Sequence, residues 1–214
     1  MPNHDTAIRS VQGLVAIVAG LGITNTLNQL IKTTRDTVRN LTSFTTRDLD
    51  LGGWIPIIMG ILQIVTALRF YQATTLNIED RHPPLPAHPP PTHDEAQLYF
   101  FVHIVVVIIE GIVVAAASFY IHYPLDFFVL FGILFVWDGG FSISAWAKLD
   151  PAPVNRTTVW AWANTIEGLL LLASCVAFSA QYIPAEVFFW AVVAWMVLNT
   201  LVVAYMNQDS YFPV

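Results

Sequence analysis

Residues 99–120, YFFVHIVVVIIEGIVVAAASFY, indicate the class of fold to which this chain belongs. The stretch is apolar over more than about twenty residues, which is the length that an α-helix needs to cross the hydrocarbon core of a bilayer. One acidic residue, Glu110, lies near its middle. A carboxyl group at that depth is costly to bury and usually has a function, so Glu110 is the first candidate site residue.

The composition of the whole chain agrees with this stretch. Of its 214 residues, 56% are hydrophobic and only 11% are charged, whereas soluble domains carry about 25% charged residues. We therefore expect an all-α, polytopic protein that is integral to a lipid bilayer, at the cell membrane. No run rich in Lys and Arg suggests a nucleic acid as partner.

Six apolar segments predict six transmembrane helices, paired as three helical hairpins in a single membrane domain. These segments cover residues 8–31, 54–76, 99–120, 126–147, 158–180 and 185–206. Residues 32–50 carry apolar side chains at roughly helical spacing among charged ones, which predicts an amphipathic helix on the membrane surface; a polar loop is the alternative. Residues 81–95 read as an extended, Pro-rich loop.

The last two predicted hairpins resemble each other. Residues 108–114, IIEGIVV, match residues 165–171, TIEGLLL, and each match is followed by a Tyr/Pro turn, an acidic residue and an aromatic pair. We interpret this as an internal repeat, which would relate the two hairpins by an axis along the membrane normal, as in many transporter folds. The alternative is convergence between apolar segments drawn from the same few residue types.

Polar residues inside the predicted helices are the candidate site. They are Glu110, Asp138, Glu167, Arg69, Asn164, Asn199 and His103. If the helices alternate in direction, these residues fall between the midplane and the side of the N-terminus. Arg69 is the only Arg or Lys deep within a predicted helix, so it is the expected counter-charge. Three carboxyl groups against one guanidinium leave an excess of negative charge, which binding of a proton or cation would neutralise.

This cluster predicts a cation or proton channel or transporter. Glu110, Asp138 and Glu167 would bind or relay the ion, while Asn164 and Asn199 would coordinate it. The alternative is a non-transporting accessory or scaffold subunit of a membrane complex, in which the same groups only hold helices together. Small residues on the first helix, Gly13, Ala16, Gly20 and Gly22, favour close helix packing and a homo-oligomer or membrane complex.

Enzyme chemistry has less support. The predicted helices contain no H-x-x-x-H or E-x-x-H pair and no phosphate loop, and Ser142, Ser144 and Ser174 have no nearby histidine base. The histidines around residues 81–95 match no strong zinc pattern, so we predict neither a metal site nor catalytic residues. The sequence leaves any cofactor unknown.

Overall fold

The computed structural model describes residues 4–41, 54–81, 93–149 and 156–206, with side chains described for 8–35, 54–72, 74–75, 101–102, 104–141 and 161–205. All regular elements in these ranges are helical, which confirms the prediction of an all-α chain. They are α1 (His4–Leu41), α2 (Ile55–Arg81), α3 (His93–Ala117), the 3-10 turn η2 (Ser118–Tyr120), α4 (Pro124–Leu149), α5 (Arg156–Ser179) and α6 (Ala185–Met206).

Five helices contain a stretch that is long and apolar enough to cross a membrane. These stretches are Ile8–Arg35, Ile55–Gln72, Pro124–Phe141, Ala161–Ser179 and Ala185–Tyr205, and a shorter apolar stretch covers Ile104–Tyr120. Large apolar side chains on them, such as Ile17, Leu21 and Val176, are more than half exposed. In water this surface would be costly, whereas lipid tails solvate it, so the helices support a multi-pass membrane protein.

The first helix is longer than its apolar pattern predicts. α1 continues to Leu41, so residues 32–41 extend it where the sequence predicts a separate surface helix over 32–50. Residues 32–41 contain neither Gly nor Pro, and nothing in them interrupts helical hydrogen bonding. Residues 42–50, and most of the predicted Pro-rich loop, lie outside the described residues. The predicted range 185–206 coincides with α6.

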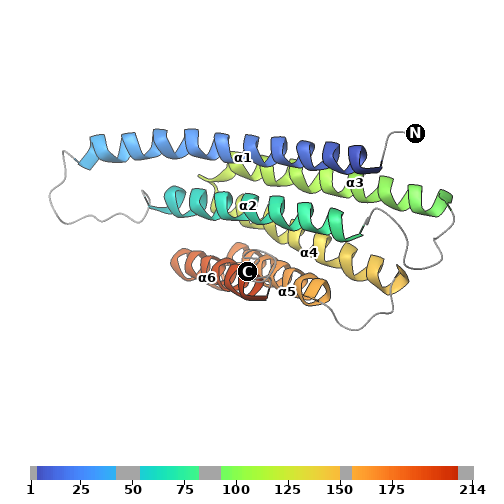
Figure 1. Cartoon of the computed structure of the whole chain (residues 1–214). Helices are drawn as coiled ribbons and strands as arrows, with labels where there is room; N and C mark the ends of the chain where they lie inside the picture. The colour runs from blue at the N-terminus through green and yellow to red at the C-terminus, as the bar shows by residue number, and fades with distance from the viewer. Residues whose placement is uncertain (1–3, 42–53, 82–92, 150–155, 207–214) are drawn as a thin grey trace. The chain divides into compact units, whose positions relative to one another are not determined.

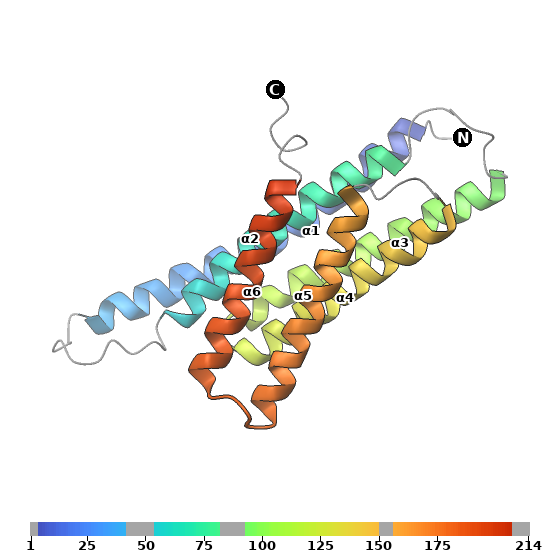
Figure 2. The same ribbon diagram turned by 90° about the horizontal axis from the view of Figure 1, so that it is seen from below.

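The chain divides into two compact units, residues 1–122 and 123–214. In the first unit α1 packs against both α2 and α3 (Figure 1). In the second, α5 packs against both α4 and α6, and the α5–α6 pair is antiparallel (Figure 2). The helices thus group three and three. The α1–α2 and α5–α6 pairs pack together within their units, and the arrangement as three hairpins stays a prediction.

Glycines bring α4 and α5 close together. A Cβ atom at Gly139 would meet the Thr165 hydroxyl and would lie 2.5 Å from the Ala161 carbonyl oxygen. A Cβ atom at Gly168 would lie 2.7 Å from the Gly132 carbonyl oxygen. Only glycine leaves room for backbones at these separations, as in other closely packed membrane helices. We refer to this contact as the glycine seam.

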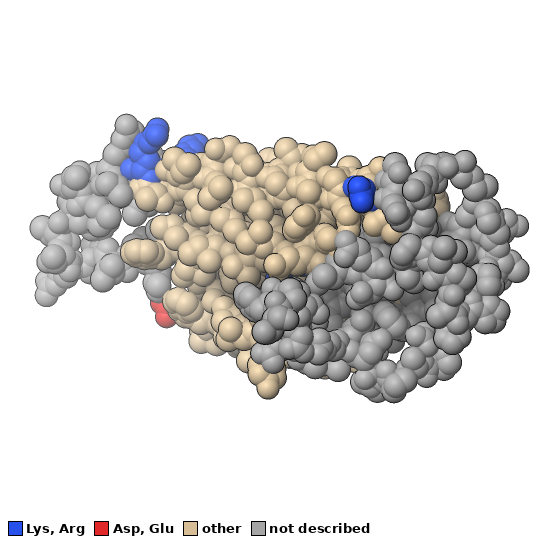
Figure 3. All heavy atoms as spheres, viewed as in Figure 1, with Lys and Arg blue, Asp and Glu red and all other residues tan. Residues whose placement is uncertain are grey.

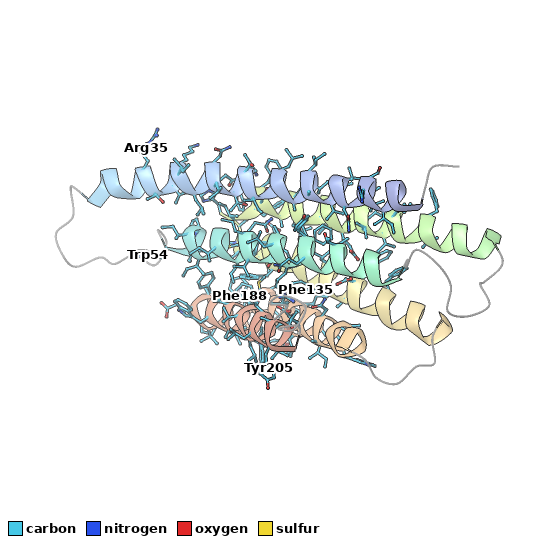
Figure 4. The ribbon with its side chains drawn as sticks, in the orientation of Figure 1. Arg35, Trp54, Phe135, Phe188 and Tyr205 are labelled. Carbon is cyan, nitrogen blue, oxygen red and sulfur yellow. The ribbon has the colours of Figure 1, made fainter. Side chains whose placement is uncertain are left out.

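Phenylalanines pack against one another in the second unit. The Phe128 ring packs edge-on against Phe127 and against Phe188 of α6, with 5.3 and 6.0 Å between ring centroids. Phe188 also stacks on Phe178 of α5 at 4.6 Å, and Phe131 stacks on Phe135 at 5.7 Å; Phe135 and Phe188 are labelled in Figure 4. These aromatic pairs join all three helices of the unit.

Basic side chains mark both ends of the apolar part of α1. Arg9 is exposed near its start, and Lys32 and Arg35 are exposed towards its end. Figure 3 shows basic side chains towards the two ends of this helix, with an uncharged surface between them. Trp54, at the start of α2, lies at the same end as Arg35 (Figure 4). Cations and Trp at such positions are typical of the boundary between lipid tails and headgroups.

Candidate functional site

A chain of hydrogen bonds crosses all three helices of the second unit. The Asn164 side-chain amide on α5 donates to Oδ2 of Asp138 on α4 at 2.9 Å. The Asn199 amide on α6 donates to Oδ1 of Asn164 at 3.3 Å. Asn164 and Asn199 are both buried. We call Asp138, Asn164 and Asn199 the carboxyl–amide chain.

The glycine seam positions this chain. Gly139 directly follows Asp138 and faces the carbonyl oxygen of Ala161. Ala161 precedes Asn164 by three residues on α5. Because no side chain separates the two helices at Gly139, the Asp138 carboxyl group comes within hydrogen-bonding distance of the Asn164 amide. A larger residue at position 139 would move α4 away from α5, and with it the carboxyl group from its donor.

The hydrogen bonds fix which way each amide is turned. An ionised carboxylate only accepts hydrogen bonds, so Asn164 must present its NH₂ group to Asp138 and its oxygen to Asn199. Asn199 then presents its own NH₂ group to Asn164. Its oxygen, Oδ1, is left at the end of the chain, where it is buried and has no hydrogen-bond partner within the described ranges.

Glu167 belongs to the same unit and helix as Asn164. It follows Asn164 by three residues, and it is buried. Residues three apart lie on the same side of a helix, so Glu167 faces the interior beside the carboxyl–amide chain. The next residue, Gly168, is part of the glycine seam. The second unit thus contains two interior carboxyl groups: that of Glu167 is buried and that of Asp138 is half-buried.

Glu110 and Arg69 lie in the first unit. Glu110 on α3 is buried, and a Cβ atom on the following residue, Gly111, would lie 2.9 Å from Val18 of α1 and 3.5 Å from Phe70 of α2. Arg69 precedes Phe70 and is half-buried. Arg69 thus lies one residue from a close approach of α2 to α3, and Glu110 lies one residue from the same approach.

Three amide side chains in the first unit contact the end of α3. The Gln63 amide of α2 donates to the Val114 carbonyl oxygen. From α1, Gln29 donates to the Ser118 carbonyl oxygen and Asn25 to the Ser118 hydroxyl, both at 2.7 Å. These contacts were not predicted from the sequence. For Gln63 a signal was available, because Gln63, Thr66 and Arg69 recur every three residues and so lie on one side of α2.

The structure therefore brings part of the predicted cluster together. Asp138, Asn164 and Asn199 join in one hydrogen-bonded chain beside Glu167, whereas Glu110 and Arg69 lie in the other unit. The pairing of Arg69 with Glu110, Asp138 or Glu167 stays a prediction. His103 lies within α3, but its side chain is outside the described ones.

Metal ligation finds no support among the residues that the structure describes. No three His, Cys, Asp or Glu side chains there are grouped so as to hold a metal ion. The single cysteine, Cys175, is a buried free thiol on α5. No protein-family model, curated protein or solved structure matches this chain.

Proposed function

We propose that this chain is an integral membrane channel or transporter that passes a small cation or a proton through the polar interior of its helices. The observation that carries the proposal is the hydrogen-bonded chain from Asn199 through Asn164 to Asp138. It presents a carboxyl group within a unit whose three helices are all candidate membrane spans.

The cost of these groups supports a functional role. An ionisable residue at the centre of a membrane helix costs about 2.5–3.5 kcal/mol on insertion scales, and Glu110, Asp138 and Glu167 each incur it. An amide donor stabilises a carboxylate without neutralising its charge. Asp138 therefore keeps its capacity to attract a cation or a proton while Asn164 holds it in place.

The finer topology belongs to the same proposal. We infer six spans, with α3 as the sixth, because its 25 residues extend about 37 Å, more than the roughly 30 Å of a hydrocarbon core. We also retain the internal repeat. In support of it, Glu110 and Glu167 are both buried, and the glycine after each packs against a neighbouring helix.

Ion flux in liposomes tests the function. The purified chain is reconstituted, and flux is followed with a Na⁺-, K⁺- or pH-sensitive dye under an imposed gradient. We expect Asp138→Asn to reduce flux at least tenfold, because the variant keeps the size of the side chain and removes its charge. Glu186→Gln is the matched control, since Glu186 is an exposed acid in the first turn of α6.

Two results would contradict the proposal. One is wild-type protein that is folded and inserted but gives no flux above empty liposomes. The other is equal flux from Asp138→Asn and Glu186→Gln. Glu110→Gln and Glu167→Gln extend the test to the other interior acids, and we expect both variants to lose flux.

A scaffold subunit is the second candidate. The observation that favours it is the close packing of Gly111 against Val18 and of Gly168 against Gly132, which gives each Glu-Gly pair a structural use. A scaffold role predicts a stable partner, either a second copy or another membrane protein. Crosslinking in native membranes, followed by flux measurement on the isolated assembly, separates this role from transport.

A further inference from the structure

We propose that Oδ1 of Asn199 binds a partly dehydrated monovalent cation such as Na⁺, and that the interior of α4–α6 therefore serves a metal cation and not a proton. This inference rests on the proposed function and narrows its substrate class. Its starting observation is that Asn199 is buried while its Oδ1 has no hydrogen-bond partner within the described part of the chain.

The chemistry of the carboxyl–amide chain argues against a proton relay. A relay needs groups that accept a proton on one side and release one on the other. A side-chain amide does neither at physiological pH, since its nitrogen only donates hydrogen bonds and its oxygen only accepts them. Asn164 and Asn199 thus interrupt proton movement towards Asp138 on this route, although they orient its carboxyl group well.

The direction of the hydrogen bonds favours a cation at the far end. Both amides turn their NH₂ groups towards Asp138 and their oxygens away from it. These aligned dipoles leave Asn199 Oδ1 as a partly negative terminus. A buried acceptor without a partner is costly, and a bound cation would remove that cost.

Oxygen ligands of this type suit alkali cations. Amide and carbonyl oxygens replace the hydration shell of such ions in membrane proteins. Glu167, beside Asn164 on the inner side of α5, adds carboxyl oxygens near the same interior. A divalent ion such as Ca²⁺ takes six to eight oxygens including several carboxylates, as a rule. Among the described residues no three acidic side chains are grouped in this way, so we assign a monovalent ion.

Cation-dependent stability of the full chain in detergent tests the assignment. Melting temperatures are measured in NaCl, KCl and choline chloride at equal ionic strength, because a ligand that binds only the folded state raises the melting temperature. We expect a Na⁺- or K⁺-specific rise for the wild type. We expect Asn199→Ala to weaken the apparent cation affinity at least tenfold, and Asn199→Asp to restore or increase it.

The first unit provides a matched control. Gln63 is likewise a buried amide that donates one hydrogen bond and whose Oε1 has no partner among the described residues. Gln63→Met should leave the cation-dependent rise unchanged. If Asn199→Ala yields no folded protein, Asn199→Asp decides the question alone, since the proposal requires it to bind the cation at least as well as the wild type.

The outcomes separate this inference from the proposed function. Equal melting in NaCl, KCl and choline chloride, or a cation-dependent rise that Asn199→Ala leaves intact, overturns the site, and a water molecule is then the better occupant. Flux that persists with such a result keeps the transport function and removes only its substrate assignment. A cation-dependent rise that depends on Asn199 but occurs without any flux keeps the site and removes transport.

Discussion

Side-chain amides in the two units, buried or half-buried, donate hydrogen bonds to different kinds of acceptor. In α1–α3, Gln63 and Gln29 donate to backbone carbonyl oxygens near the end of α3. In α4–α6, Asn164 donates to the carboxyl group of Asp138, and Asn199 donates to Asn164. The first arrangement fastens one helix to its neighbours. The second presents an ionisable group, and for this reason the proposed ion chemistry is placed in α4–α6, while the amides of α1–α3 contact backbone.

The glycines of α1 differ from those of the glycine seam. The small residues of α1 predicted close packing, but nothing lies within 4 Å of a Cβ atom at Gly13 or Gly20, and Gly22 alone approaches another helix, 3.4 Å from the Ala115 Cα atom. At the glycine seam a Cβ atom would overlap backbone atoms. Small residues in α4 and α5 therefore determine helix separation, whereas most of those in α1 do not.

The largest loss of stability is expected from a substitution in the glycine seam. Gly139→Ala places a methyl group against the Thr165 hydroxyl and the Ala161 carbonyl oxygen, which should destabilise the protein by about 3 kcal/mol, the upper range for overpacking. Thermal unfolding in detergent, followed by size-exclusion chromatography, measures the loss.

The adjacent glycine is the control for this change. Nothing lies within 4 Å of a Cβ atom at Gly140, so Gly140→Ala should leave the melting temperature unchanged or raise it slightly through the better helix propensity of Ala. Equal melting temperatures for the two variants would mean that α4 and α5 do not meet closely at Gly139.

A smaller loss of stability is expected when Asn164 is replaced, and it should exceed the loss from replacing Gln63. Asn164→Leu removes the group that both Asp138 and Asn199 contact, and we expect it to cost about 2 kcal/mol because buried polar groups lose their partner. Gln63→Met removes one donor and, with it, the buried Oε1 that lacks a partner, so its cost should stay below about 1 kcal/mol. Chemical or thermal unfolding of both variants measures the difference, and the reverse order would refute the division of roles.

The smallest change in stability is expected at the C-terminal end of α5, which differs from that of α3. η2 follows α3, and Ser118 there is held by Asn25 and Gln29 of α1. α5 instead ends by itself: the backbone N–H groups of Gln181 and Tyr182 donate to the carbonyl oxygens of Phe178 and Ala177, with Gln181 at φ 63°. This is a Schellman motif, which normally has Gly at the position of Gln181.

Gln181→Gly should therefore stabilise the protein by about 0.5–1 kcal/mol, because Gly relieves the cost of a left-handed residue and gives back part of the gain through its freedom in the unfolded chain. Ala180→Gly is the control and should destabilise slightly, since Ala180 does not adopt a positive φ. A lower melting temperature for Gln181→Gly would show that the turn between α5 and α6 is not left-handed at this position.

Helix positions follow largely from local sequence. Apolar runs of about twenty residues predicted α2, α4, α5 and α6 to within five residues at each end, because the cost of exposing apolar residues depends on length and composition alone. The end of α1 was missed for the same reason: residues 32–41 are polar, and their helical state depends on continuity with the preceding helix. Glu110, Asp138 and Glu167 were found as candidates because a charge in an apolar run is visible without a structure.

The sequence by itself determined that the chain is all-helical, that it has the hydropathy of a multi-pass membrane protein, and that it carries carboxyl and amide groups within its apolar helices. Only the tertiary structure decided how those groups are connected. Gly139 sets the approach of α4 to α5, and this approach joins Asp138 to Asn164 and leaves Oδ1 of Asn199 at the end of the chain. Composition and periodicity predict where a single helix lies in the chain. A hydrogen bond between two helices depends in addition on the distance at which their backbones pack.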